Sequence, residues 1–383
     1  MAAGKTHAVE SSLILGRMAL INAARQSLSN AGYAEVQTPI LHRKLSGFEK
    51  GSGFSTFSAS LGERLWLRAA PELYLKRMLV GLQGQGVGKL FEMALCLRDE
   101  FDETNPKEGF DRPEFTLLEL YAVEKDPSSL EKLLRKTIDL AVKQLEKRRL
   151  LKSPEAKAGA KSLRAPWERK RYSDLLKTID PKFDLELLLQ PKVKPAKGDR
   201  VALHAAALES RANDAALRDA SAALAYKAGG LEAKLRTGPQ GYWYDYIDHA
   251  FRTKVSPKLA GPVVVYDTPL ESSPLAESED GIHAQKWELY HNGVRIALGQ
   301  RELMDANAQT VRFKHLDTLR RLGYGLLPEP DEAFLDELKK WPQTKPVIGM
   351  GLYMDRLAGS LFGIVAPDGG GQERMLPNLF KSR

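Results

Sequence analysis

Two strand-like runs, 89–97 and 115–123, carry residue types that can bind a charged substrate. Side chains two residues apart on a strand share a face. By this alternation the end of the first run and one face of the second present Arg98, Glu100, Phe115, Leu117, Glu119 and Tyr121. Charged strand residues usually lie in solvent, but this face also carries Phe and Leu, and a buried carboxylate needs a partner. A planar guanidinium beside an aromatic ring and acids suits bidentate binding of phosphate or carboxylate groups.

The hairpin reads Arg98-Asp-Glu, a loop, and then Arg112-Pro-Glu-Phe-Thr-x-x-Glu-x-Tyr. These residues resemble motif 2 of the class II aminoacyl-tRNA synthetases, in the version used by lysyl-tRNA synthetases and their truncated relatives. The resemblance implies that Arg98 binds the α-phosphate of ATP and the amino-acid carboxylate. It also implies that Phe115 stacks on adenine and that Glu100 faces the nucleotide. Attack of a carboxylate on the α-phosphorus requires charge neutralisation and no covalent helper.

The segment 11–30 reads as an amphipathic helix that ends before Gly32, and the strand that follows closes on Pro39. This arrangement resembles motif 1 of the family, which forms the dimer interface, so we expect a homodimer. Lysyl-tRNA synthetases carry an anticodon-binding β-barrel before this motif, and the residues before 11 leave no room for one. We therefore expect a stand-alone catalytic domain.

Glycines 349 and 351 precede Arg356 and the amphipathic run 357–362. Glycine lets a backbone approach a ligand closely, and a helix N-terminus favours an anion. The stretch resembles motif 3, which implies that Gly351 borders ATP and substrate and that Arg356 stacks on adenine opposite Phe115. A core helix with an incidental arginine is the alternative reading. Three motifs in the family's order predict an α+β fold, with a mixed, mainly antiparallel sheet flanked by helices.

A cationic amino acid requires acids beside the nucleotide, because a buried ammonium must be paired. In lysine-activating members of the family two acids and a tyrosine bind the substrate ε-ammonium, and the matching residues are Glu119, Tyr121 and Glu302. Ala70-Pro71-Glu72 opens a helix where the family reads Ser-Pro-Glu, which implies that Glu72 binds the α-amino group. Alternatively, Glu119 and Glu302 pair with arginine or lysine of the protein itself, such as Arg301 next to Glu302, and Glu72 is favoured there by the helix dipole alone.

A second hairpin is predicted over 287–299, because Asn292-Gly293 between two alternating runs is a strong turn signal. With these two residues as the loop, the expected facing pairs are Tyr290 with Arg295 and Glu288 with Ala297. Glu288 and Arg295 are then diagonal neighbours that can form an ion pair. The hairpin resembles the family's metal-binding hairpin, which implies that Glu288 binds ATP and Mg²⁺.

Several residues depart from the family pattern. Arg295 stands in place of the second metal-binding glutamate, Leu298 in place of an asparagine, and Tyr353 in place of the third motif 3 glycine. Asp111-Arg112 replaces a His-Asn pair in the motif 2 loop. We hypothesise that Arg295 pairs with Glu288 and weakens or removes the protein-bound metal site, while Mg²⁺ still arrives on ATP. The changes imply either a shifted substrate or a damaged catalyst.

Composition bounds the partners and the location. Lysine and arginine outnumber aspartate and glutamate 57 to 49, which favours a polyanionic partner, although many of the cations lie in the stretch 143–197 and can equally be solvated. The single Cys96 excludes an internal disulfide.

No apolar run is long enough for a membrane span or a signal peptide, so we expect a cytoplasmic protein. We expect a single domain over 1–383 that contains a helix-rich, lysine-rich insertion at 125–260.

These observations predict a ligase that activates an amino acid with ATP. The resemblance is closest to truncated relatives that attach a lysine-type amino acid to a lysine of elongation factor P. Transfer to tRNA or to a small molecule is the first alternative. A non-catalytic paralogue that binds an amino acid or ATP and regulates a partner is the second.

Overall fold

The computed structural model describes residues 2–44, 53–98, 113–190, 199–212, 214–229, 242–322, 331–342 and 344–363, with backbone alone for 2–12. Three residues of the expected site, Glu100, Asp111 and Arg112, lie outside this part of the chain.

The main sheet has eight strands in the order β1-β5-β6-β11-β10-β9-β8-β7. All neighbours from β5 to β8 pair antiparallel, and the edge strands β1 and β7 pair parallel. The strands are β1 Ala34–Glu35, β5 Lys89–Leu97, β6 Glu114–Val123, β7 Glu168–Arg171, β8 Pro262–Tyr266, β9 Lys286–His291, β10 Val294–Arg301 and β11 Val347–Tyr353. A smaller sheet contains β2 Leu41–His42, β3 Ser55–Ser58 and β4 Glu63–Leu67 in the order β2-β4-β3. The predicted mixed, mainly antiparallel sheet is confirmed.

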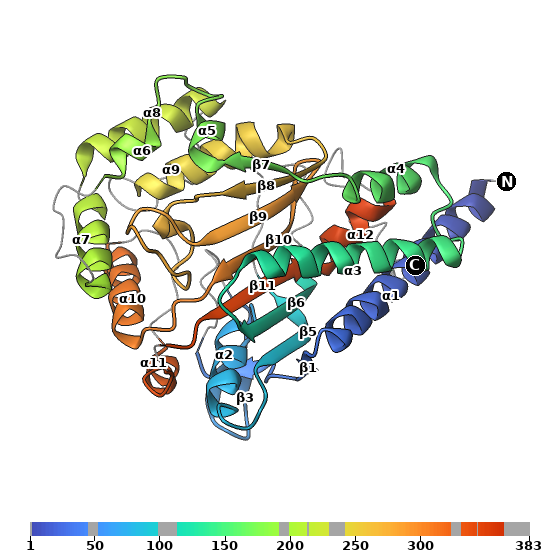
Figure 1. Ribbon diagram of the computed structural model, residues 1–383, viewed down its shortest axis with the longest axis horizontal. Coiled ribbons are helices and arrows are strands. Elements are labelled where there is room, and N and C mark those ends of the chain that lie inside the picture. The colour runs from blue at the N-terminus through green and yellow to red at the C-terminus, as the bar shows by residue number, and fades with distance from the viewer. Residues whose placement is uncertain are drawn as a thin grey trace.

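Four helices cover one face of the main sheet (Figure 1) and bury its apolar side chains in the largest core. They are α1 Ala2–Asn30, α3 Ser128–Lys147, α4 Pro154–Leu163 and α12 Met354–Phe362. α1 begins nine residues before the expected start at 11. It ends at Asn30, just before Gly32, whose φ of 79° only glycine adopts easily. α4 begins where the Ser153 side chain accepts a hydrogen bond from the Ala156 amide.

The remaining helices lie toward the opposite face and the ends of the strands (Figure 1). They are α2 Glu72–Gly81, α5 Tyr172–Leu176, α6 Leu185–Leu188, α7 Arg200–Ala212, α8 Ala215–Gly229, α9 Trp243–Ala250, α10 Ala306–Arg321 and α11 Glu332–Leu338. Shorter elements are the π-helix η2 Phe251–Val255 and the 3-10 helices η3 Ser256–Lys258 and η4 Leu270–Ser272. Residues of α5, α6, α8 and α9 share a core with β8 and β9. Residues of α2, α10 and α11 share another with β5, β6 and β11. Within the described residues, no helix is long and apolar enough to cross a membrane.

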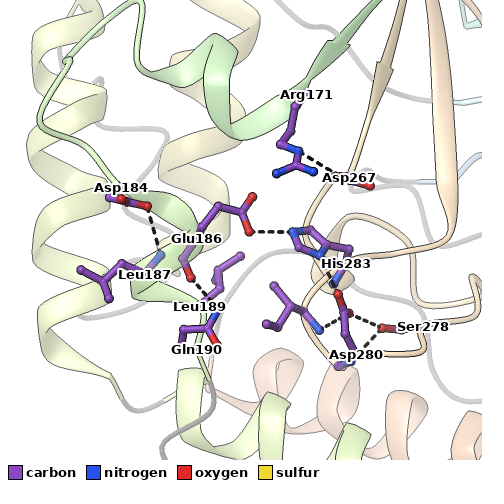
Figure 2. A network of polar contacts seen from close by, with 12 residues as sticks. Arg171, Asp184, Glu186, Leu187, Leu189, Gln190, Asp267, Ser278, Asp280 and His283 are labelled. Atoms are coloured by element: carbon purple, nitrogen blue, oxygen red, sulfur yellow. Dashed lines mark hydrogen bonds and ion pairs between the residues drawn. The ribbon is translucent and has the colours of Figure 1, made fainter.

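Polar contacts attach the helix-rich middle of the chain to the segment before β9 (Figure 2). His283 lies between two acids, with Nδ1 2.7 Å from Asp280 Oδ2 and Nε2 3.0 Å from Glu186 Oε2. Burial opposes the charged ring, but the two carboxylates outweigh it and raise the pKa of His283. On α7, Arg211 donates to Glu271 Oε1 at 2.8 Å. These helices therefore hold the segment 271–283 from outside the sheet.

Candidate functional site

The face of the sheet opposite α1 and α3 carries the predicted functional residues. The register of β5, β6 and β11 places Glu119 opposite Glu92 and Gly351, as regular alternation requires. Arg98 follows β5, and its backbone amide donates to the Pro113 carbonyl at 2.8 Å. The two-strand platform that the sequence predicted is therefore present in the described residues.

Arg98 and Phe115 lie against each other. The guanidinium carbon of Arg98 is 5.0 Å from the centre of the Phe115 ring, and its Nε donates to the Ala69 carbonyl at 3.0 Å. Arg98 is largely buried, whereas Phe115 is half-buried. A guanidinium held in this way is positioned before any ligand arrives.

Arg356, in the first turn of α12, lies on the other side of Tyr353 from Phe115. The guanidinium carbon of Arg356 is 4.6 Å from the Tyr353 ring centre, and its Nη1 donates to the Arg295 carbonyl at 3.1 Å. The Tyr353 ring centre is 6.1 Å from that of Phe115. The structure thus brings the two arginines and the phenylalanine together around a tyrosine that the family pattern lacks.

Three glutamates and a tyrosine form an acidic cluster on the same face, and a lysine lies inside it. Lys76 on α2 is fully buried, with Nζ 2.5 Å from Glu302 Oε2 and 3.0 Å from Glu72 Oε1. It also lies 5.4 Å from the Tyr121 ring centre. Tyr121 donates its hydroxyl hydrogen to Glu119 Oε1 at 2.7 Å. The alternative that the acids pair with a cation of the protein is therefore confirmed for Glu302, and Glu72 shares the same lysine.

The cation was not the one expected. Arg301 forms an ion pair with Glu279, with Nη1 3.4 Å from Oε1. Lys76 follows Glu72 by four residues, a spacing at which side chains meet on a helix, and this was the available signal in the sequence.

Charge is not balanced in the cluster, because one ammonium faces three carboxyl groups. Burial opposes the ammonium of Lys76, but Glu302 and Glu72 outweigh it and raise the pKa of Lys76. Burial raises the pKa of Glu119 to about 8, with a further contribution from Glu72. Burial also raises the pKa of Glu302, and Lys76 opposes this. Raised carboxyl pKa values indicate a place where an additional cation would be stabilised.

The glycines of β11 make room for these acids. A Cβ on residue 349 would lie 2.2 Å from Glu302 Oε1 and 2.4 Å from the Tyr121 ring, and a Cβ on Gly351 would lie 3.0 Å from Glu119 Oε2. A side chain at position 349 or 351 would therefore displace residues of the acidic cluster. The expected role of Gly351, to border a ligand, stays a prediction, but its packing against Glu119 is a structural reason for glycine.

The hairpin of β9 and β10 forms as predicted, but its register differs by one residue beyond Arg295. Asn292 and Gly293 have φ values of 50° and 91°, as the tight turn requires. Arg295 faces Tyr290 as expected, whereas Glu288 faces Leu298 and not Ala297, because the ladder is irregular between Arg295 and Ala297. Such a β-bulge inserts one extra residue, so the expected pair of Glu288 with Ala297 was wrong.

Glu288 is enclosed by donors. Its Oε1 lies 2.8 Å from Lys286 Nζ and 3.0 Å from Arg295 Nη1, and its Oε2 accepts from the Tyr290 hydroxyl at 2.9 Å. The predicted ion pair with Arg295 is therefore present, and Lys286 is an additional partner that the sequence reading missed. Burial would raise the pKa of Glu288, but the two cations outweigh it and hold that pKa well below its usual range.

Comparison with known proteins gives a family context. The family model for tRNA synthetases class II (D, K and N) matches residues 5–365. A lysine–tRNA ligase 2 of Methanosarcina mazei is 31% identical over 352 residues, which cover 91% of this chain and 59% of that protein. Lysine–tRNA ligases of Pelotomaculum thermopropionicum and Campylobacter jejuni are each 30% identical over 345 and 348 residues, or 89% and 90% of this chain. The chain spans 59% of the length of each of these curated relatives.

Proposed function

This chain belongs to the class II tRNA synthetases, and from that premise we propose that it condenses an amino acid with ATP and transfers the resulting aminoacyl group to an acceptor. The observation that supports this most is the juxtaposition of Arg98 and Phe115 with the acidic cluster on the same strand face. Arg98 binds the substrate carboxylate and the α-phosphate, and the adenine stacks on Phe115 beside Tyr353 and Arg356. The carboxylate is itself the nucleophile, so alignment and charge neutralisation supply the catalysis.

The proposed amino acid has a cationic side chain, as lysine does. The ammonium of Lys76 already pairs with Glu72 and Glu302, so a second ammonium, that of the substrate side chain, fits best beside Glu119. We propose that Glu119, with Tyr121 and Glu302, faces the side-chain ammonium and that Glu72 faces the α-amino group.

ATP–pyrophosphate exchange across a panel of amino acids tests this function. Exchange should occur, and it should be fastest with lysine or a close analogue. Absence of exchange with every amino acid, in a protein that is folded, would refute the proposed activity.

The pH dependence of amino-acid binding tests the role of Glu119. In the free protein this carboxyl is protonated below about pH 8. A ligand ammonium favours the carboxylate, so binding releases a proton, and affinity should rise between pH 6.5 and 8 and then level off. Calorimetry in two buffers of different ionisation enthalpy measures the release. Glu119→Gln should reduce this release, with the remainder coming from Glu302, and should weaken binding by about 1.5–3 kcal/mol.

Norleucine distinguishes the side-chain placement of Glu119 from an α-amino one, because it keeps the α-amino group and lacks the side-chain ammonium. Proton release with lysine and not with norleucine, reduced in Glu119→Gln, is the expected result. Release with both ligands that is lost in Glu119→Gln would move Glu119 to the α-amino end, and release with lysine that Glu119→Gln leaves unchanged would remove it from the substrate site.

The proposed acceptor is a protein lysine of the elongation factor P type, as in the truncated relatives that the sequence resembles. The relatives found by comparison are named for tRNA, so tRNA is the first alternative, and a small molecule is another. Incubating the labelled adenylate complex with tRNA and with elongation factor P, separately, identifies the acceptor by the molecule that becomes labelled.

We propose that the protein is a homodimer through the outer side of α1. Ile14, Leu15 and Met18 are between 37% and 53% exposed, which is unusual for three large apolar residues on neighbouring turns of a helix. Met18→Asp should give a particle of half the wild-type mass in light scattering, because a buried carboxylate without a partner opposes association. Leu187→Asp, at an exposed apolar residue of α6, is the matched control and should leave the mass unchanged. A monomeric wild type would refute the dimer.

A second candidate function is a non-catalytic protein that binds an amino acid and regulates a partner. It is favoured by Tyr353, whose ring lies against Arg356 in the region assigned to the nucleotide. This candidate predicts a thermal shift with lysine but none with ATP, and no exchange. A shift with ATP, together with exchange, would exclude it.

A further inference from the structure

The hairpin of β9 and β10 carries an internal charge arrangement that no family resemblance supplies. Both oxygens of Glu288 already accept from protein groups, Oε1 from Lys286 at 2.8 Å and Arg295 at 3.0 Å, and Oε2 from Tyr290 at 2.9 Å. The Glu288 side chain is 8% exposed and that of Lys286 is 6% exposed. Two buried or half-buried cations thus share one carboxylate, and the group as a whole is positive.

The family's metal does not fit these residues. Mg²⁺ takes oxygen ligands in near-octahedral geometry and needs carboxylates to offset its charge. Here Arg295 stands at the second carboxylate position, and a divalent ion on Glu288 would have to displace or closely approach a guanidinium and an ammonium. Over the described ranges, no group of three or more His, Cys, Asp or Glu side chains is placed to hold a metal ion.

One of these cations, Arg295, borders the proposed nucleotide site. The guanidinium carbon of Arg295 is 5.9 Å from the Tyr353 ring centre, and Arg356 donates to the Arg295 carbonyl while lying 4.6 Å from that ring. Through Tyr353 this group adjoins Phe115 and Arg98. The guanidinium groups of Arg98, Arg295 and Arg356 therefore lie along the proposed nucleotide site, and guanidinium groups bind phosphate oxygens well.

We propose that Arg295 and Lys286 replace a protein-bound divalent ion at this hairpin, so that the nucleotide's phosphates are neutralised by side chains and any Mg²⁺ arrives on the nucleotide alone. Neutralisation of the phosphates by side chains rests on the proposed function, whereas the loss of the protein-bound metal ion does not.

Binding of Mn²⁺ to the full chain without nucleotide tests the metal part, with electron paramagnetic resonance as the readout. Wild type and Glu288→Gln should bind the same amount of Mn²⁺, because Glu288 holds no metal ion in the wild type. Arg295→Glu should gain one site, with affinity at least about tenfold above wild type, because a second carboxylate is added. Arg295→Gln, which removes the cation and adds no acid, is the control and should gain much less. A wild-type site abolished by Glu288→Gln would overturn the proposal, and so would an Arg295→Glu protein that binds no more Mn²⁺ than wild type.

Calorimetry with adenosine 5′-(β,γ-imido)triphosphate tests the nucleotide part. The wild-type affinity should change by no more than about threefold when Mg²⁺ is replaced by EDTA, since side chains retain most of the phosphate contacts. Arg295→Glu should lose nucleotide affinity in EDTA and regain it with Mg²⁺. Loss of wild-type binding in EDTA would overturn the proposal. Absence of binding under both conditions would instead refute the proposed function, and the Mn²⁺ result would stand independently.

Discussion

Replacing Arg98 with alanine is expected to reduce ATP–pyrophosphate exchange by at least about 10²–10³-fold, the effect of removing one preorganised charge-stabilising group. Arg98 is held by the Ala69 carbonyl and the Phe115 ring and needs no ligand for its position. Its proposed partners, the substrate carboxylate and the α-phosphate, are both anionic and repel each other without a cation between them. The loss should therefore appear in kcat and in kcat/KM.

Folding controls separate this effect from general damage. The Arg98→Ala protein should melt within a few degrees of wild type, since the hydrogen bond to the Ala69 carbonyl and the contact with the Phe115 ring are each worth little in net stability. Arg98→Lys keeps the charge without the bidentate geometry, and it should recover only part of the exchange. Arg25→Ala removes an arginine from an exposed ion pair with Glu35 and should leave exchange unchanged. Undiminished exchange in Arg98→Ala would show that the motif was misassigned.

Replacing Lys76 with methionine is expected to lower the free energy of unfolding by about 3–5 kcal/mol, as when one partner of a buried ion pair is removed. Lys76 has no exposed surface, and its ammonium is the cation between Glu302 and Glu72. Without it, Glu302 stays buried beside two other carboxyl groups. Urea denaturation of the two proteins at pH 8 measures the difference.

The loss should depend on pH in a defined direction. Removing Lys76 raises the pKa of Glu302 further, and a raised carboxyl pKa gives stability that is present at low pH and lost as pH rises through it. The deficit of Lys76→Met should therefore be smaller at pH 5 than at pH 8. A deficit that is equal at both values would show that lost packing, and not charge, is the cause.

Two further variants support the comparison. Lys76→Met combined with Glu302→Gln removes both charges and should recover much of the lost stability, because replacing both partners can be nearly neutral. Lys143→Met removes a lysine from an exposed ion pair with Asp139 and should cost less than about 1 kcal/mol. A double variant as unstable as the single one would argue against an ion pair of this strength.

Local patterns in the sequence determined the platform of the site. Alternation in β5 and β6 places Phe115 and Glu119 on one face, and Asn292-Gly293 specifies the second hairpin, because strand period and turn type depend on neighbouring residues. The mainly antiparallel sheet was implied by the resemblance of the three motifs, in their order, to the family. The pair of Glu288 with Arg295 also followed from turn register.

Contacts between distant elements were decided by the tertiary structure. Lys76 and Glu302 are far apart in the sequence but form an ion pair, and no periodicity links α2 to the end of β10. The β-bulge beyond Arg295 turns Leu298 to the face of Glu288, although regular alternation would place Arg295 and Leu298 on opposite faces. Tyr353 lies between Arg356 and Phe115 only because α12 and β6 meet there. Charge and shape in the site are sums over side chains from separate elements, so they exist only once the elements are packed.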